Sequence, residues 1–155
     1  VVVDSIDYLQ DLIWTHTCEV HSQPSIEAFG YGKGYQEAMT YWNEFLDCCD
    51  ALRRQGKIVC LLAHSQVKVF NSPITENYDR YCIALHKNAE AKVVSFCDIV
   101  GFATYEVFIK TEKGAFNKEK KKGIGSGKRL LHLNEQPAWT AKNRFNIEGS
   151  IEFYK

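Results

Sequence analysis

Two polar segments follow apolar runs, and their side chains are of the kinds that contact metal ions and phosphates. The run VVV is followed by Asp4 and Ser5, and the run KIVCLLA is followed by His64. Because ligands of open α/β sheets bind beyond the carboxyl ends of the strands, we expect the two segments to be neighbours. A carboxylate at the end of such a strand orients a hydrated Mg²⁺ beside nucleotide phosphates. An aspartate that caps the following helix explains Asp4 equally well.

The elements that position these residues follow two periodicities. Apolar side chains that recur every three and four residues predict helices over 5–20, 35–54 and 87–96. Continuous or alternating apolar runs predict strands over 1–3, 57–63, 99–110 and 129–133. Because the first two runs are apolar throughout, we expect strands that are buried on both faces, as in a parallel sheet covered by helices. We expect the third to pair antiparallel at an edge.

Two segments have the composition of loops. Residues 67–73 predict a short extension or loop that projects from the sheet, because Asn, Ser and Pro follow one another there. Residues 112–128 are rich in lysine and glycine and predict a mobile hairpin tip or loop.

Composition excludes several classes of protein. A chain of 155 residues with 45% hydrophobic and 25% charged residues is typical of one globular domain. Basic and acidic residues are equal at 19 each, so any binding to nucleic acid needs a local patch rather than a bulk positive charge. No apolar run approaches the roughly 18 residues that span a bilayer. We therefore expect a cytoplasmic protein without a membrane partner.

The segment VVVDSIDYL resembles the Walker B segment of RecA-like ATPases. The order of VVVDSIDYL, GYGKGYQEAMTYWNEF, LLAHSQVKVF, CDIVGFA and AWTAKNRF is similar to phage nucleotide-binding proteins with a RecA-like core, a group that includes single-strand annealing proteins. The resemblance implies part of a RecA-like P-loop NTPase core, an α/β fold whose mainly parallel sheet is flanked by helices and has antiparallel edge strands. Residues 1–155 would be the carboxyl-terminal part of that core, as a single domain.

The resemblance also implies roles for five residues. Asp4 would orient Mg²⁺ through water, with Ser5 beside the nucleotide, and His64 would be the sensor of the γ-phosphate at a strand end. Lys142 and Arg144 match the late basic pair that reaches phosphate, often across a subunit boundary, and stabilises transition-state charge. Each assignment has a structural alternative. His64 also fits a hydrogen-bonded histidine at a strand end, and the basic pair also fits solvated surface charge.

The implied function is that of an ATP-binding, ATP-hydrolysing phage DNA recombination protein, which uses ATP and Mg²⁺ and acts on single-stranded DNA as a homo-oligomer in the host cytoplasm. The residues expected to contact DNA are Ser65, Gln66, Lys68, Lys120, Lys121 and Lys122. One alternative is a module that binds or anneals single strands without hydrolysis, with lysines on the DNA backbone and aromatic rings stacked on bases. A structural remnant of the fold or a domain that binds a protein partner is another.

The sequence departs from the family pattern at the phosphate-binding loop. G-x-x-x-x-G-K-[ST] does not occur in the 155 residues. The segment 123–129 comes nearest, but Lys122 stands at the first glycine position and Arg129 replaces the Ser or Thr that binds Mg²⁺. We therefore expect the phosphate loop and the catalytic glutamate to precede Val1, and these residues to be inactive by themselves.

Overall fold

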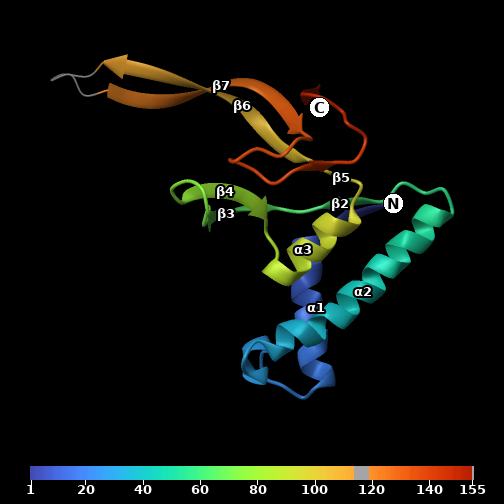
Figure 1. The fold of residues 1–155 in the computed structure, drawn as a ribbon. Coiled ribbons are helices and arrows are strands. Elements are labelled where there is room, and N and C mark those ends of the chain that lie inside the picture. The colour runs from blue at the N-terminus through green and yellow to red at the C-terminus, as the bar shows by residue number, and fades with distance from the viewer. Residues whose placement is uncertain (114–118, 155) are drawn as a thin grey trace. The chain divides into compact units, whose positions relative to one another are not determined.

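The computed structural model describes residues 1–113 and 119–154, and the side chains of 1–108 and 123–154 (Figure 1). The chain divides into two compact units, 1–97 and 98–155. Each unit is described below by itself, and a single domain over 1–155 stays a prediction.

The first unit contains all the described helices and four strands. Its elements in chain order are β1 (Val2–Asp4), α1 (Ile6–Val20), the 3₁₀ helix η1 (Ile26–Phe29), α2 (Lys33–Arg54), β2 (Cys60–Leu62), β3 (Ser65–Phe70), β4 (Tyr78–Ile83) and α3 (Lys87–Phe96). The three predicted helices are confirmed. The bounds of α3 are those expected from the sequence, and α2 ends just before Gly56, whose positive φ of 77° suits the turn that leaves the helix.

The apolar stripes of the three α-helices form one core. Ile6 and Ile13 of α1 pack with Trp42 of α2 and with Val93 of α3, and all four side chains are buried. Trp42 is only 1% exposed. Because α1 begins directly after β1, this packing fixes where the first strand ends.

The first two strands form a parallel pair, in which Val2, Val3 and Asp4 lie opposite Cys60, Leu61 and Leu62. Val3 and Leu61 pack against the helical core, whereas Val2 is 64% and Leu62 is 42% exposed. The expectation that these strands are buried on both faces is therefore wrong for the described chain. Side chains alternate across a strand, and the core covers only one face of this pair.

The segment expected to be a projecting loop is an antiparallel hairpin. β3 pairs with β4 along six residues, from Ser65 opposite Ile83 to Phe70 opposite Tyr78. Polar residues conceal the second strand in the sequence, because Arg80 lies on its buried face. The Arg80 guanidinium lies over the Phe70 ring, 5.3 Å from its centre, and the residue is only 9% exposed.

The second unit consists of strands. They are β5 (Ile99–Val100), β6 (Phe102–Lys113), β7 (Glu119–His132), β8 (Lys142–Asn143) and β9 (Ser150–Phe153). β7 lies between β6 and β9 in an antiparallel sheet, and β5 pairs with β8. β6 and β7 form a long ribbon (Figure 1). Residues 112–128 were predicted as a hairpin tip or loop. Residues 112–113 belong to β6 and 119–128 to β7, the two arms of an antiparallel hairpin, so a loop is wrong for these residues, and 114–118 lie outside the described chain.

The described sheets therefore differ from the mainly parallel sheet that the resemblance implies. Only β1 and β2 run parallel among the described strands, and every other pairing is antiparallel. The fold is mixed α/β, with its helices confined to the first unit as far as the structure describes the chain.

Candidate functional site

The parallel pair brings the two polar segments to one end. Asp4 is the last residue of β1 and lies opposite Leu62, the last residue of β2. His64 follows two residues later. Asp4 is exposed, and the His64 side chain is 80% exposed. Both side chains are therefore open to a ligand at the carboxyl end of the pair.

A third residue, Asp7 in the first turn of α1, joins this site. One of its carboxylate oxygens, Oδ2, lies 2.8 Å from Nδ1 of His64, and the other accepts a hydrogen bond of 3.1 Å from the backbone N–H of His64. Sequence analysis missed Asp7. The signal was its spacing of three residues from Asp4, which places it in the first helical turn beyond the strand end.

The contact changes the acid–base properties of both partners. Burial alone would raise the pKa of Asp7, but hydrogen bonds from the His64 ring, the Ser5 side chain and the His64 backbone outweigh it and lower the pKa from 3.8 to about 2. The hydrogen bond to Asp7, its negative charge and the charge of Asp4 raise the pKa of His64 above 6.5. Asp7 is therefore ionised at neutral pH, and the charged form of His64 is favoured.

Ser5 stands at the N-cap of α1, but its side chain makes no capping hydrogen bond. The hydroxyl instead contributes to the hydrogen bonding of Asp7. The predicted position beside a nucleotide is compatible with this place between β1 and α1, and the predicted role stays untested.

A family model described as an AAA domain, AAA_24, matches residues 1–145. The chain belongs to this family. AAA domains typically bind ATP with Mg²⁺, so the site at the end of β1 and β2 is considered below as part of a nucleotide site. No curated protein and no solved structure matches the chain. The family match does not extend to a phage origin, to recombination or to single-stranded DNA, and these stay predictions.

The residues at this site of the AAA domain fit a water-mediated contact to Mg²⁺ rather than coordination of the ion by protein side chains alone. Among the described residues, no group of three or more His, Cys, Asp or Glu side chains is placed to hold a metal ion. Mg²⁺ in nucleotide sites keeps several waters and uses one or two carboxylates together with phosphate oxygens. The exposed carboxylate of Asp4 suits such a water-mediated contact.

The predicted DNA contacts on β3 have different surroundings. Ser65 is exposed. The Gln66 side chain donates to the carbonyl oxygen of Ile83 at 2.8 Å, and the Lys68 ammonium forms a 2.9 Å ion pair with Glu90 of α3. Gln66 and Lys68 thus connect the hairpin to the helical core. The positions of Lys120, Lys121 and Lys122 on β7 are described only for the backbone, opposite Glu112, Thr111 and Lys110 of β6.

The late basic pair belongs to the second unit. Lys142 is half-buried in β8. The Arg144 guanidinium donates to Oδ1 of Asp98 at 2.7 Å, and the Arg144 backbone N–H donates to the carbonyl oxygen of the same residue. Arg144 therefore has an acidic partner within its own unit. A role of either residue at the phosphates stays a prediction.

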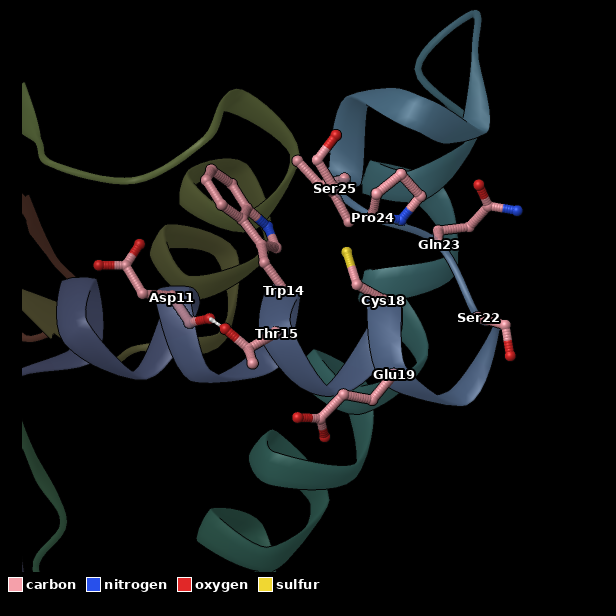
Figure 2. Close-up of a pocket in the computed structure, with 10 residues that line it drawn as sticks. Asp11, Trp14, Thr15, Cys18, Glu19, Ser22, Gln23, Pro24 and Ser25 are labelled. Atoms are coloured by element: carbon pink, nitrogen blue, oxygen red, sulfur yellow. Dashed lines mark hydrogen bonds between the residues drawn. The ribbon is translucent and has the colours of Figure 1, made fainter.

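Two open grooves lie elsewhere in the described part of the chain, and neither includes Asp4, Asp7 or His64. One of about 530 Å³ lies between α1 and the segment 22–26 (Figure 2). Figure 2 shows Trp14 and Cys18 of α1 beside Pro24 and Ser25 there. The other, of about 430 Å³, is lined by 126–129 and 152–154 in the second unit. Within the described chain, no helix has the length and apolar character needed to cross a bilayer.

Proposed function

We propose that this AAA domain contributes the metal-orienting and sensor residues of an ATP-hydrolysing site. The observation that carries the proposal is the parallel pairing of β1 with β2, which places Asp4 and His64 at one end of two adjacent strands. The family match supports a nucleotide as the ligand. ATP with Mg²⁺ would supply the phosphoryl group that is transferred to water. Asp4 would orient a metal-bound water, and His64 would contact the phosphate end.

The phosphate-binding loop is the part that these residues do not supply. The sequence has no G-x-x-x-x-G-K-[ST] segment. Backbone N–H groups of such a loop hold the phosphates in P-loop enzymes. We propose that the loop lies in the natural protein outside these 155 residues, so the test of activity uses the natural full-length protein.

The test compares Asp4→Asn with Asp11→Asn in the natural full-length protein. Asp11 is an exposed carboxylate on α1 and serves as the matched control. Asp4→Asn removes the charge that orients the metal, and we expect ATP turnover to fall about 100-fold or more, while Asp11→Asn stays within about twofold of wild type. Equal turnover in Asp4→Asn and wild type would exclude the metal role.

We further propose that the protein binds single-stranded DNA and acts on it in recombination or annealing as a homo-oligomer. The support is the register of the β6–β7 ribbon, which places Lys120, Lys121 and Lys122 on adjacent positions of one strand and Lys110 opposite Lys122. Like charges at directly opposite positions of two strands are unfavourable, and a bound anion such as a phosphate would reduce this cost. Lys142 and Arg144 would act at the phosphates of a neighbouring subunit.

Salt dependence separates this function from the alternative without hydrolysis. The logarithm of the affinity for single strands falls linearly with the logarithm of the salt concentration. Each contact between a lysine and a phosphate adds about 0.7 to the steepness of this slope. Replacing Lys120, Lys121 and Lys122 by glutamine should reduce the slope by about two. If this happens while Asp4→Asn changes neither ATP turnover nor DNA affinity, the chain is a module that binds single strands without hydrolysis. An unchanged slope would exclude these lysines as DNA contacts.

A further inference from the structure

His64 is held on both sides of its backbone. Its N–H donates to Asp7 on α1, and its carbonyl oxygen accepts a 2.9 Å hydrogen bond from the backbone N–H of Ala84, which follows β4. The residue therefore bridges the first turn of α1 and the end of the β3–β4 hairpin. With the backbone fixed, only the two side-chain torsions decide where the imidazole points.

Asp7 fixes those torsions. Its two carboxylate oxygens contact the ring Nδ1 and the backbone N–H of the same residue, at 2.8 and 3.1 Å. A carboxylate with two contacts to one histidine holds the ring in a single orientation, as a bidentate acceptor does in other ion pairs. The Asp7 side chain is only 21% exposed, so water competes little for its oxygens.

The same contact requires a proton on Nδ1 and favours the charged ring, in which Nε2 carries a proton as well. An ionised carboxylate only accepts hydrogen bonds, so Nδ1 of His64 must be the donor. Nε2 is then the remaining ring nitrogen, and within the described residues it has no hydrogen-bond partner. Because the His64 side chain is 80% exposed, Nε2 is open to a ligand.

We propose that Asp7 is a positioning residue for His64: it holds Nδ1–H of the imidazolium against α1 and leaves Nε2–H as the donor that meets a phosphate oxygen of the nucleotide. This inference rests on the proposed function. Asp7 itself does not contact the phosphates. It acts through the orientation and the charge of the histidine, as the buried carboxylate of a catalytic triad orients its histidine and stabilises the imidazolium.

The test uses the natural full-length protein with Asp7→Asn, the control Asp11→Asn, and His64→Gln alone and combined with Asp7→Asn. Asparagine keeps the size of the side chain, but its amide group is uncharged and donates to Nδ1. The ring is then neutral and carries its proton on Nε2. Nitrogen-15 NMR of the imidazole reports which ring nitrogen is protonated. We expect protonation of Nδ1 in wild type and in Asp11→Asn, and its loss in Asp7→Asn.

We expect the ATP turnover number of Asp7→Asn to fall about tenfold or more with little change in KM, because a neutral ring that no carboxylate holds stabilises the charge developing on the phosphate in the transition state less well. On the His64→Gln background, Asp7→Asn should cause no further loss, since Asp7 acts through the histidine. A residue that only stabilises the fold would lower turnover equally on both backgrounds. Circular dichroism confirms that each variant is folded.

Two failures are distinguishable. If ATP neither shifts the His64 resonances nor is hydrolysed in wild type, the proposed function is wrong and this inference fails with it. If wild type hydrolyses ATP and Asp7→Asn keeps its turnover or its Nδ1 proton, only the positioning role is wrong. A further loss on the His64→Gln background would likewise overturn it.

Discussion

Replacing Asp7 by alanine should destabilise the first unit by an amount that depends on pH. The pKa of Asp7 is lowered from 3.8 to about 2, mainly against the effect of burial and through the hydrogen bonds from His64 and Ser5. One pKa unit corresponds to about 1.4 kcal/mol, so the ionised form contributes on the order of 2 kcal/mol to folding. The side chain is 21% exposed, so solvent reduces this value only in part.

The sign follows from which state binds the proton. Because the folded pKa of Asp7 is the lower one, its contribution is complete above about pH 4 and is lost as the pH falls toward about 2. The pKa of His64 is raised on folding by the same contact, so its contribution is complete below about pH 6.5 and is lost as the pH rises through the folded pKa. The pair should therefore be strongest near pH 5.

Urea unfolding followed by far-UV circular dichroism measures the effect, because all the described helices belong to the first unit. With a urea dependence of about 2 kcal/mol per molar, Asp7→Ala should lower the midpoint by about 1 M near pH 5. The difference from wild type should shrink near pH 2. Asp11→Ala is the control and should change the midpoint little at either pH.

An equal loss of stability at both pH values would contradict this prediction, because only the ionised carboxylate makes the contact with His64. A double-mutant cycle gives a second check. With His64 already replaced by alanine, Asp7→Ala should cost clearly less than in wild type. Additive losses would show that Asp7 stabilises α1 without the histidine.

Three further predictions concern the packing of the first unit. Gly34→Ala should lower the urea-unfolding free energy by about 1 to 3 kcal/mol, despite the better helix propensity of alanine, because the added Cβ meets the carbonyl oxygen of Ile26. Lys68→Met should lower the free energy of unfolding by about 1 kcal/mol, because the contact with Glu90 is lost, and should leave the affinity for single-stranded DNA unchanged. Weaker DNA binding at unchanged stability would contradict this prediction. Burial, helped by the charges of neighbouring lysines, lowers the pKa of His86, so the folded state loses stability as the pH falls from about 7 to about 5. His86→Asn removes this titration, and the urea midpoint of the variant should fall less over the same pH range.

The sequence predicted the helices well, because a stripe of period 3.6 is hard to produce by other means. It did not predict β8 or β9, and it failed for β4 and for the lysine-rich part of β7. In β4 the inward position is taken by Arg80, which is buried against an aromatic ring, so polarity gives the wrong face. In β7 lysine and glycine have low strand propensity, and the strand is specified by pairing with β6 over 102–113. Both depend on contacts between segments, which local composition does not contain.

The site was predicted in part for a similar reason. Asp4 and His64 follow apolar runs, and the end of a strand is a position that sequence reveals. Lys142 and Arg144 were assigned by resemblance alone, and the structure places Arg144 beside Asp98 without testing its proposed role. The contact partner of an exposed arginine is not encoded in its neighbours along the chain.

Asp7 shows how the rule of strand ends can be extended. An acid in the first turn of a helix is normally explained by its favourable interaction with the helix dipole, so its position alone does not mark it as a site residue. Yet α1 starts one residue after β1, so its first turn must lie beside the end of that strand. The next parallel strand ends at the same edge, and His64, two residues beyond its end, comes within reach. When a strand runs directly into a helix, the acids of the first turn therefore belong to the candidate site as much as the residue that closes the strand.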